Sequence, residues 1–243
     1  MIEEVKGGQN IYGEAIGIIT VKTKFPRIPG DIGNATTWDF PVMYRVVKET
    51  SPARVVGRVD PKLLEPFIEA ARDLEKVGVK AITTTCGFLA LFQEEISNSV
   101  NVPVFTSSLM QVPLVYRMLR RNQKVGIITI DSGLLTKKHL AGVGADSVPT
   151  IIVGTEDGKE FNRVILENEI TLNVKKARAD LVTVAKRLVR QYTEVGAIVL
   201  ECTNMPPYAR SIQQEVGLPV FDIYTLINMV YSAVVRKDFT GYL

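Results

Sequence analysis

The chain contains two cysteines, Cys86 and Cys202, and an ionised thiol can act as a nucleophile or as a base that removes a proton. Each cysteine follows an apolar run that predicts a strand, AITTT before Cys86 and AIVLE before Cys202. The motif Pro-Val-Phe follows at the same interval in both places, at Pro103–Phe105 and Pro219–Phe221. The chain therefore contains a repeat that places one thiol at the end of a strand in each half.

Two thiols on opposite sides of one small molecule could remove a proton from one face of a carbon and deliver a proton to the other. Both cysteines are expected at helix N-termini, where free N–H groups and the helix dipole lower the pKa of a thiol and bind anions. Two other interpretations are open. Each cysteine can be a small buried residue, and the two can form a disulfide if the halves nearly touch there.

The elements that position the thiols follow from short apolar runs and helical spacing. Strands without polar alternation, separated by helices, predict parallel sheets covered on both faces, hence an α/β fold. The expected strands are 14–21, 41–47, 79–85, 102–106, 124–130, 148–154, 197–201 and 218–222. The expected helices are 61–77, 88–99, 109–121, 133–143, 161–169, 177–194, 205–216 and 224–236, the first with Asp60 as N-cap and Pro61 at its first position.

The repeat predicts two pseudo-symmetric lobes, residues 1–110 and 111–223, and the final segment 224–243 carries a helix that can pack back onto the first lobe. Ligands of open parallel sheets bind at the carboxyl ends of the strands. The cleft between the lobes is therefore the expected active site, with both thiols facing it.

Composition and motifs exclude several function classes. A net charge of +3 is too small to indicate nucleic acid or an anionic membrane surface, and the apolar runs are too short to span a bilayer. The polar N-terminus does not resemble a signal peptide, so a cytoplasmic location is expected. The sequence shows no metal-ligand cluster, phosphate loop or dinucleotide fingerprint, so no cofactor is expected. His139, beside two lysines, is interpreted as a solvated residue of a surface helix.

Polar residues after the first strand are candidates for substrate binding. The segment 22–40 is too rich in Pro, Gly, Asn and Thr for regular structure, and so long a loop is usually functional. Arg27 could pair with a carboxylate, and Asn34, like Asp31, Thr36 and Thr37, could form hydrogen bonds with a substrate. The alternative is a network of ordinary turns.

Three further residues lie at predicted strand ends. Ser132 is placed to contact a carboxylate, and the alternative is a helix cap. Thr85 can reach a ligand, although its β-propensity explains it equally well. Glu201, beside Cys202, could accept a proton, repel an anionic substrate or support the site from behind, and the sequence does not choose.

The motifs TTTCGF, LECTNMPP and GIIT, with the duplicated strand–Cys–helix unit, resemble the aspartate/glutamate/hydantoin racemase superfamily over nearly the whole chain. The resemblance implies two flavodoxin-like lobes, frequent dimers, and cofactor-independent racemisation by Cys86 and Cys202. It also implies that Thr203 holds a substrate carboxylate. Gly87 and Phe88 stand where amino-acid racemases usually have Asn-Thr, and Asn204 where Glu or His is common. All three are taken as substrate contacts, and these differences argue against aspartate or glutamate as the substrate.

We therefore expect a homo-oligomeric racemase or epimerase of a small carbon acid such as an amino acid, a hydantoin or a related carboxylate. The alternatives are a one-cysteine isomerase or decarboxylase, like the maleate isomerases and arylmalonate decarboxylases of the same superfamily, and a small-ligand-binding protein with inert thiols. The apolar Phe88 suggests a larger or less polar substrate than an acidic amino acid.

Overall fold

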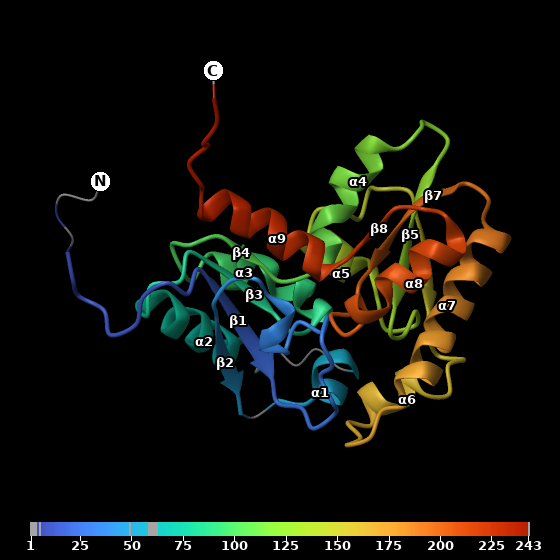
Figure 1. Ribbon diagram of the computed structural model, residues 1–243. Coiled ribbons are helices and arrows are strands. Elements are labelled where there is room, and N and C mark those ends of the chain that lie inside the picture. Colours follow the sequence, from blue (N-terminus) through green and yellow to red (C-terminus); the bar gives the residue numbers. More distant parts are fainter. Residues whose placement is uncertain (1–3, 5, 49, 58–62, 243) are drawn as a thin grey trace.

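Two four-stranded parallel sheets form the centre of the molecule (Figure 1). The computed structural model describes residues 4, 6–48, 50–57 and 63–242. The strand order is β2-β1-β3-β4 in the first sheet and β6-β5-β7-β8 in the second, so the two lobes repeat one topology. The strands are β1 Ile16–Val21, β2 Val42–Val47, β3 Ala81–Thr84, β4 Val104–Phe105, β5 Lys124–Thr129, β6 Thr150–Gly154, β7 Val195–Leu200 and β8 Val220–Phe221. The two-lobed α/β architecture expected from the sequence is confirmed.

Helices cover the sheets in both lobes (Figure 1). The α-helices are α1 Pro52–Gly57, α2 Leu64–Lys76, α3 Gln93–Ser97, α4 Val112–Met118, α5 Lys137–Gly142, α6 Phe161–Leu166, α7 Val174–Gln191, α8 Pro206–Val216 and α9 Ile223–Val234. The described residues also form the 3₁₀ helices η1 Ala35–Thr37, η3 Gly87–Phe92 and η4 Ser108–Gln111. The predicted cap Asp60 and first helical residue Pro61 lie outside the described residues.

Equivalent glycines let the covering helices approach the central strands. A Cβ on Gly17 of β1 would lie 3.0 Å from Leu74 of α2, and a Cβ on Gly126 of β5 would lie 2.7 Å from Leu188 of α7. Both distances are shorter than a normal carbon–carbon contact of about 3.5–4.0 Å. The matching motifs around these glycines therefore encode the same helix-on-strand packing in both lobes.

The chain after Cys86 differs from the expected α-helix, whereas α8 after Cys202 begins one residue after the expected start at Met205. Gly87–Phe92 is a 3₁₀ helix in which nearly every side chain is buried, and α3 begins only at Gln93. After Cys202 the chain turns through Thr203 and Asn204, and α8 begins at Pro206. A segment buried on all sides has no exposed face and hence no 3.6-residue pattern, which is why the sequence did not distinguish the two kinds of helix.

The interpretation of His139 as a solvated surface residue is wrong. Its side chain is only 3% exposed, because α5 packs against η3, and its ring lies edge-on to Phe88 at 5.0 Å between centroids. Nδ1 accepts a hydrogen bond from the backbone N–H of Thr136 at 3.1 Å. Burial lowers the pKa of His139, so the ring is neutral.

The apolar core continues from one lobe to the other. Phe88, Ala90 and Leu109 of the first half belong to the same buried cluster as Val125 and Ile198 of the second. The last helix, α9, packs on the first sheet, where Ile223, Leu226 and Ile227 join a separate cluster with Ile16 and Ile18.

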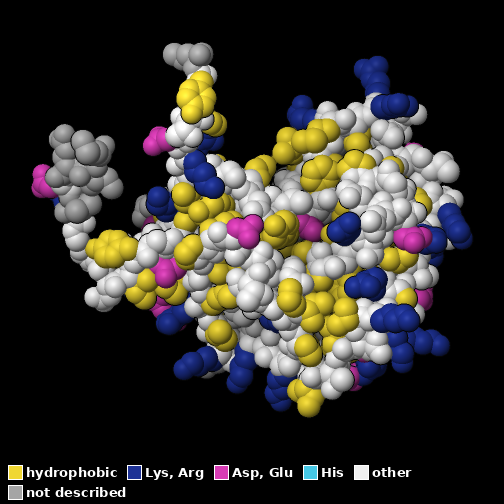
Figure 2. Space-filling model, viewed as in Figure 1, with side chains coloured by type: hydrophobic (Ala, Val, Ile, Leu, Met, Phe, Trp, Pro, Cys, Tyr) yellow, Lys and Arg dark blue, Asp and Glu magenta, His cyan; other side chains and the backbone are white. Residues whose placement is uncertain are grey.

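On the face shown in Figure 2, lysine and arginine side chains are dispersed around the periphery, with hydrophobic side chains between them. The terminal segments extend from the body of the molecule (Figures 1 and 2). Phe239 and Tyr242 near the C-terminus are exposed. In the described part of the chain, none of the helices combines the length and the apolar character needed to span a bilayer.

Candidate active site

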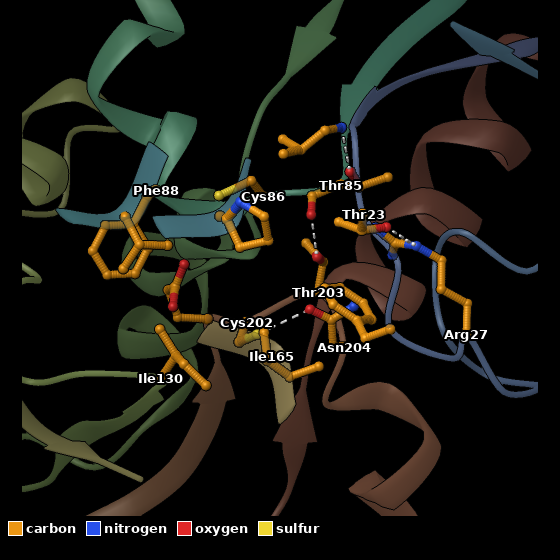
Figure 3. Close-up of a pocket in the computed structure, with 16 residues that line it drawn as sticks. Thr23, Arg27, Thr85, Cys86, Phe88, Ile130, Ile165, Cys202, Thr203 and Asn204 are labelled. Carbon is orange, nitrogen blue, oxygen red and sulfur yellow. Dashed lines mark hydrogen bonds between the residues drawn. The ribbon is translucent and has the colours of Figure 1, made fainter. Parts of the chain in front are cut away.

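Both cysteines line one narrow pocket between the lobes (Figure 3). Its walls are mainly apolar, and they come from the ends of β1, β3 and β7, from the loop after β1, and from α1 and α6. The lining residues are Val21, Thr23, Phe25, Arg27, Pro52, Val56, Thr85, Cys86, Gly87, Phe88, Ile130, Ile165, Glu201, Cys202, Thr203 and Asn204.

The thiols occupy equivalent places but differ in exposure. Cys86 is the N-cap of η3 and is partly exposed, whereas Cys202 lies two residues beyond β7 and is only 8% exposed. Both are free cysteines, so the disulfide considered from the sequence does not form here. The sulfur of Cys202 is 3.5 Å from Oδ1 of Asn204.

The expected lowering of the thiol pKa values is wrong. Burial, reinforced by the nearby negative charge of Glu201, raises the pKa of Cys86 to about 12. The same two causes raise the pKa of Cys202 well above its usual value. Backbone N–H groups do act in the expected direction, from Phe88 and Leu89 on Cys86 and from Asn204 on Cys202, but desolvation outweighs them.

Glu201 is a fully buried carboxyl group in the pocket wall. Its side chain is 0% exposed, and the hydroxyl of Thr129 donates a hydrogen bond to Oε2 at 2.8 Å. Its Oε1 has no hydrogen-bond partner among the described residues. Burial raises the pKa of Glu201 to about 7, against the Thr129 hydroxyl and the N–H of Ile130, which favour the charged form. The sequence singled out this residue without assigning it a role.

The loop after β1 is both a turn network and a wall of the pocket. Arg27 forms a salt bridge with Asp31 at 2.8 Å and lies over the ring of Phe25, 4.9 Å from its centroid. Asp31 in turn accepts a hydrogen bond from Nδ2 of Asn204 at 2.6 Å, which connects the loop to the second lobe. Arg27 therefore reaches the pocket as expected, already paired with a carboxylate of the protein.

Asn34 does not line the pocket. Its Nδ2 donates to the carbonyl oxygen of Arg27 at 2.8 Å, and its Oδ1 accepts from the N–H of Thr36 at 2.9 Å. The proposed substrate contact at Ser132 is also absent from the pocket wall, because that residue is exposed and its N–H donates to Glu156. For Asn34 the structure supports the alternative of a turn network. Ser132 lies in a turn and is not a helix cap, because the N-cap of α5 is Thr136.

Two threonine hydroxyls of the pocket are used to join its walls. Thr203 donates to the carbonyl oxygen of Thr85 at 2.7 Å, and the hydroxyl of Thr85 accepts from the N–H of Val21 at 3.1 Å. Both residues line the pocket as expected, but their hydroxyl groups form hydrogen bonds with the backbone of the protein itself.

Several pocket residues were not identified from the sequence. Phe25 lies in the long loop two residues from Arg27, and its aromatic ring beside a cation was a usable signal. Ile165 of α6 and Val56 of α1 come from elements far from either cysteine, and apolar residues at helical spacing carry no mark of a site. In the part of the chain that the structure describes, no group of three or more His, Cys, Asp or Glu residues is placed to hold a metal ion.

Comparison with known proteins shows which family this chain resembles. A family model described as Asp/Glu/Hydantoin racemase matches residues 109–227. A dimethylsulfoniopropionate lyase from Durusdinium sp. clade D is 30% identical over 220 residues, which cover 88% of this chain and 72% of that protein.

Solved structures share the fold at lower identity. A mutant of arylmalonate decarboxylase in its sulfate-associated form superposes with a TM-score of 0.62 at 18% identity, covering 93% of this chain and 97% of that one. A glutamate racemase from Bacillus anthracis superposes with a TM-score of 0.61 at 11% identity, covering 92% of this chain and 85% of that one. The family resemblance expected from the sequence is thereby confirmed. The chain belongs to the aspartate/glutamate/hydantoin racemase superfamily of enzymes.

Proposed function

We propose that this enzyme is a cofactor-independent lyase that removes a proton from the carbon next to a carboxylate and so expels a leaving group from the neighbouring carbon. The observation that carries the proposal is the presence of Cys86 and Cys202 in one small apolar pocket, in a chain whose relative at 30% identity is a dimethylsulfoniopropionate lyase. One thiolate is the general base. The racemisation expected from the sequence would use the same first step.

The pocket suits a molecule with a carboxylate at one end and a dialkylsulfonium group at the other. Arg27 and the N–H groups around Cys86 and Cys202 are the donors available to a carboxylate. The aromatic ring of Phe88 can bind a sulfonium cation through its face, as aromatic residues bind quaternary ammonium groups.

The elimination needs only one base. The thiolate takes the proton from the α-carbon, the electron pair of that C–H bond forms the carbon–carbon double bond, and the β-carbon–sulfur bond breaks. The leaving sulfide takes that bonding pair and becomes neutral. For dimethylsulfoniopropionate the products are acrylate and dimethyl sulfide, and the proton stays on the cysteine.

A second candidate is the two-base racemisation expected from the sequence. It is favoured by one specific observation: elimination requires one thiol, yet two thiols at equivalent positions of the repeat line the pocket. A racemase uses one thiol on each face of the carbon. The lyase and the racemase therefore differ in the second step, after the first proton has been removed.

The test is to incubate the purified protein with dimethylsulfoniopropionate in D₂O. Dimethyl sulfide is measured by gas chromatography and acrylate by proton NMR. Amino acids and hydantoins are screened in parallel for deuterium at the α-carbon. Dimethyl sulfide without α-exchange of amino acids supports the lyase. Deuterium exchange into both enantiomers of one compound supports the racemase. If neither dimethyl sulfide nor deuterium exchange is detected, both proposals are contradicted.

Cysteine variants assign the base. We expect Cys86→Ser or Cys202→Ser to lower kcat/KM by about 100-fold or more, the usual contribution of a general base. If both thiols are needed, a single variant stops racemisation but retains exchange with one enantiomer. Ser132→Ala is the matched control, since its hydroxyl lies outside the pocket, and it should retain full activity. Full activity in both cysteine variants would contradict thiol catalysis.

A further inference from the structure

Glu201 is the one carboxyl group among the residues that line the pocket, and no described residue neutralises it. Its neighbour in sequence is Cys202, and its side chain packs against Gly87, which follows Cys86. A Cβ on Gly87 would overlap both the Oε1 and the carbonyl oxygen of Glu201. The carboxyl group is therefore held beside the chain segments that carry the two thiols.

The thiols have no other proton acceptor in the pocket wall. Besides the cysteines and Glu201, the ionisable group among the lining residues is Arg27, a permanent cation paired with Asp31. A thiol with a raised pKa needs an acceptor before it can act as a base at neutral pH. The unpartnered Oε1 of Glu201 is an acceptor site that the fold leaves open.

We propose that Glu201 and the thiols of Cys86 and Cys202 form one proton-exchanging unit that holds a single negative charge, so that Glu201 takes up the proton when either cysteine becomes a thiolate. In this step the S–H bond breaks, an O–H bond forms on the carboxyl group, and the negative charge moves from oxygen to sulfur. No other reactant is needed. Glu201 acts through the thiols, and it is a positioning residue in this sense.

The physical reason is the cost of two negative charges in one dry pocket. The charge of Glu201 raises the pKa of both thiols, and burial raises the pKa of Glu201 itself to about 7. A carboxylate and a thiolate therefore oppose one another, whereas a carboxylic acid beside a thiolate keeps the total charge unchanged. Groups coupled in this way titrate together.

The remaining groups around Glu201 do not replace it in this role. From β5 it receives the neutral hydroxyl of Thr129. From the loop after β1, Arg27 and Asp31 act on the thiols as an ion pair. From α5, His139 lies behind Phe88 and stays neutral because burial lowers its pKa.

The test is the pH dependence of Cys86 alkylation by iodoacetamide, followed by peptide mass spectrometry between about pH 5.5 and 9.5. It requires no substrate, so it stands even if the proposed lyase assay fails. We expect wild type and Glu201→Gln to react equally at pH 6, where the carboxyl group is neutral. At pH 9 Glu201→Gln should react about tenfold faster than wild type. The rates should differ by a factor of about ten for each pKa unit by which the charge of Glu201 raises the pKa of the thiol.

Two further variants make the result decisive. In wild type the alkylation rate should stop rising with pH once Glu201 is ionised. Thr129→Val removes a hydrogen bond that favours the charged carboxylate, so in this variant the rate should flatten at a higher pH. This variant also serves if Glu201→Gln does not fold. Asp222→Asn is the matched control, because Asp222 is another buried carboxyl group, 3% exposed, outside the pocket. Its profile should match wild type. The proposal would be overturned if the pH profiles of wild type and Glu201→Gln superimposed, or if the alkylation rates of the two proteins differed by the same factor at every pH.

Discussion

At the scale of single residues, Gly87 and Glu201 determine how the site is closed. Gly87 is the first residue of η3, directly after Cys86, and its missing side chain is the space that the Glu201 carboxyl group occupies. Amino-acid racemases usually have asparagine at this position, as the resemblance implies. The carboxyl group of Glu201 fits beside Cys86 because residue 87 has no side chain.

We expect Gly87→Ala to abolish activity at least as fully as a cysteine variant, because the new Cβ displaces Glu201 and moves Cys86 with it. The measurement is kcat/KM with the proposed substrate, together with the rate of Cys86 alkylation at pH 9. Gly133→Ala is the control, since its Cβ would meet only Asp131 at 3.3 Å outside the pocket. A Gly87→Ala enzyme with wild-type kinetics would show that the contact is easily relieved.

At the scale of elements, the loop between β1 and β2 is held to the second lobe through charged and polar side chains. Arg27 and Asp31 form a largely buried ion pair, with side-chain exposures of 12% and 4%. The other oxygen of Asp31 accepts from Asn204, which follows Cys202. The loop and the segment that carries the second thiol are therefore one hydrogen-bonded unit.

Removing one partner of this ion pair should cost more than removing both. Asp31→Ala leaves the buried guanidinium of Arg27 without its partner, and we expect a loss of about 3 kcal/mol or more in the free energy of unfolding. Arg27→Met combined with Asp31→Ala should recover part of that loss. Urea denaturation measures both variants. Glu215→Ala, which breaks the exposed pair with Lys186, is the control and should cost less than about 1 kcal/mol. Equal losses in all three would contradict the argument.

At the scale of the whole molecule, the lobes share a core and the last helix crosses between them. The largest buried cluster contains residues of both halves, and α9 follows the last strand of the second sheet but packs on the first. Ser108, after β4, donates through its hydroxyl to the carbonyl oxygen of Leu200 in the second lobe at 2.6 Å. The pocket therefore lies between bodies that are joined on more than one side.

Buried carboxyl groups make the stability of this molecule depend on pH. Burial raises the pKa of Glu201 from 4.5 to about 7 and that of Asp222 from 3.8 to about 6. The folded state thus holds these protons more tightly than the unfolded state. Stability is then greatest below the ordinary pKa values and falls as the pH rises through the folded values. Each group costs about 3 kcal/mol once ionised.

We therefore expect the free energy of unfolding to fall between about pH 4 and 8, and to fall less in Glu201→Gln and Asp222→Asn than in wild type. Urea denaturation at several pH values measures the slopes. His139 acts with the opposite sign, because its pKa is lowered and its contribution is lost as the pH falls. It is present in every variant, so the difference between variant and wild type isolates each carboxyl group. Parallel curves would show that these groups titrate normally in the folded state.

The sequence by itself determined the order of the strands and of most helices, although not α1, together with the two-lobed repeat, the family, and the position of both thiols at strand ends. These features depend on periodicity, on turn residues and on motifs within a few positions of each other, which are properties of the local chain. Phe88, Thr85 and Thr203 could be placed near the thiols for the same reason, since they adjoin a cysteine or precede it directly.

Only the tertiary structure decided the electrostatics of the site. The direction of the thiol pKa values depends on desolvation by residues such as Ile165 and Val56, which lie far away in the sequence. Asp31 and Asn204, which form a hydrogen bond, are 173 positions apart. The burial of His139 and of the unpartnered Glu201 likewise depends on which elements pack together. A local pattern can place a cysteine at a strand end, but the charge it carries there is set by every group that the fold brings around it.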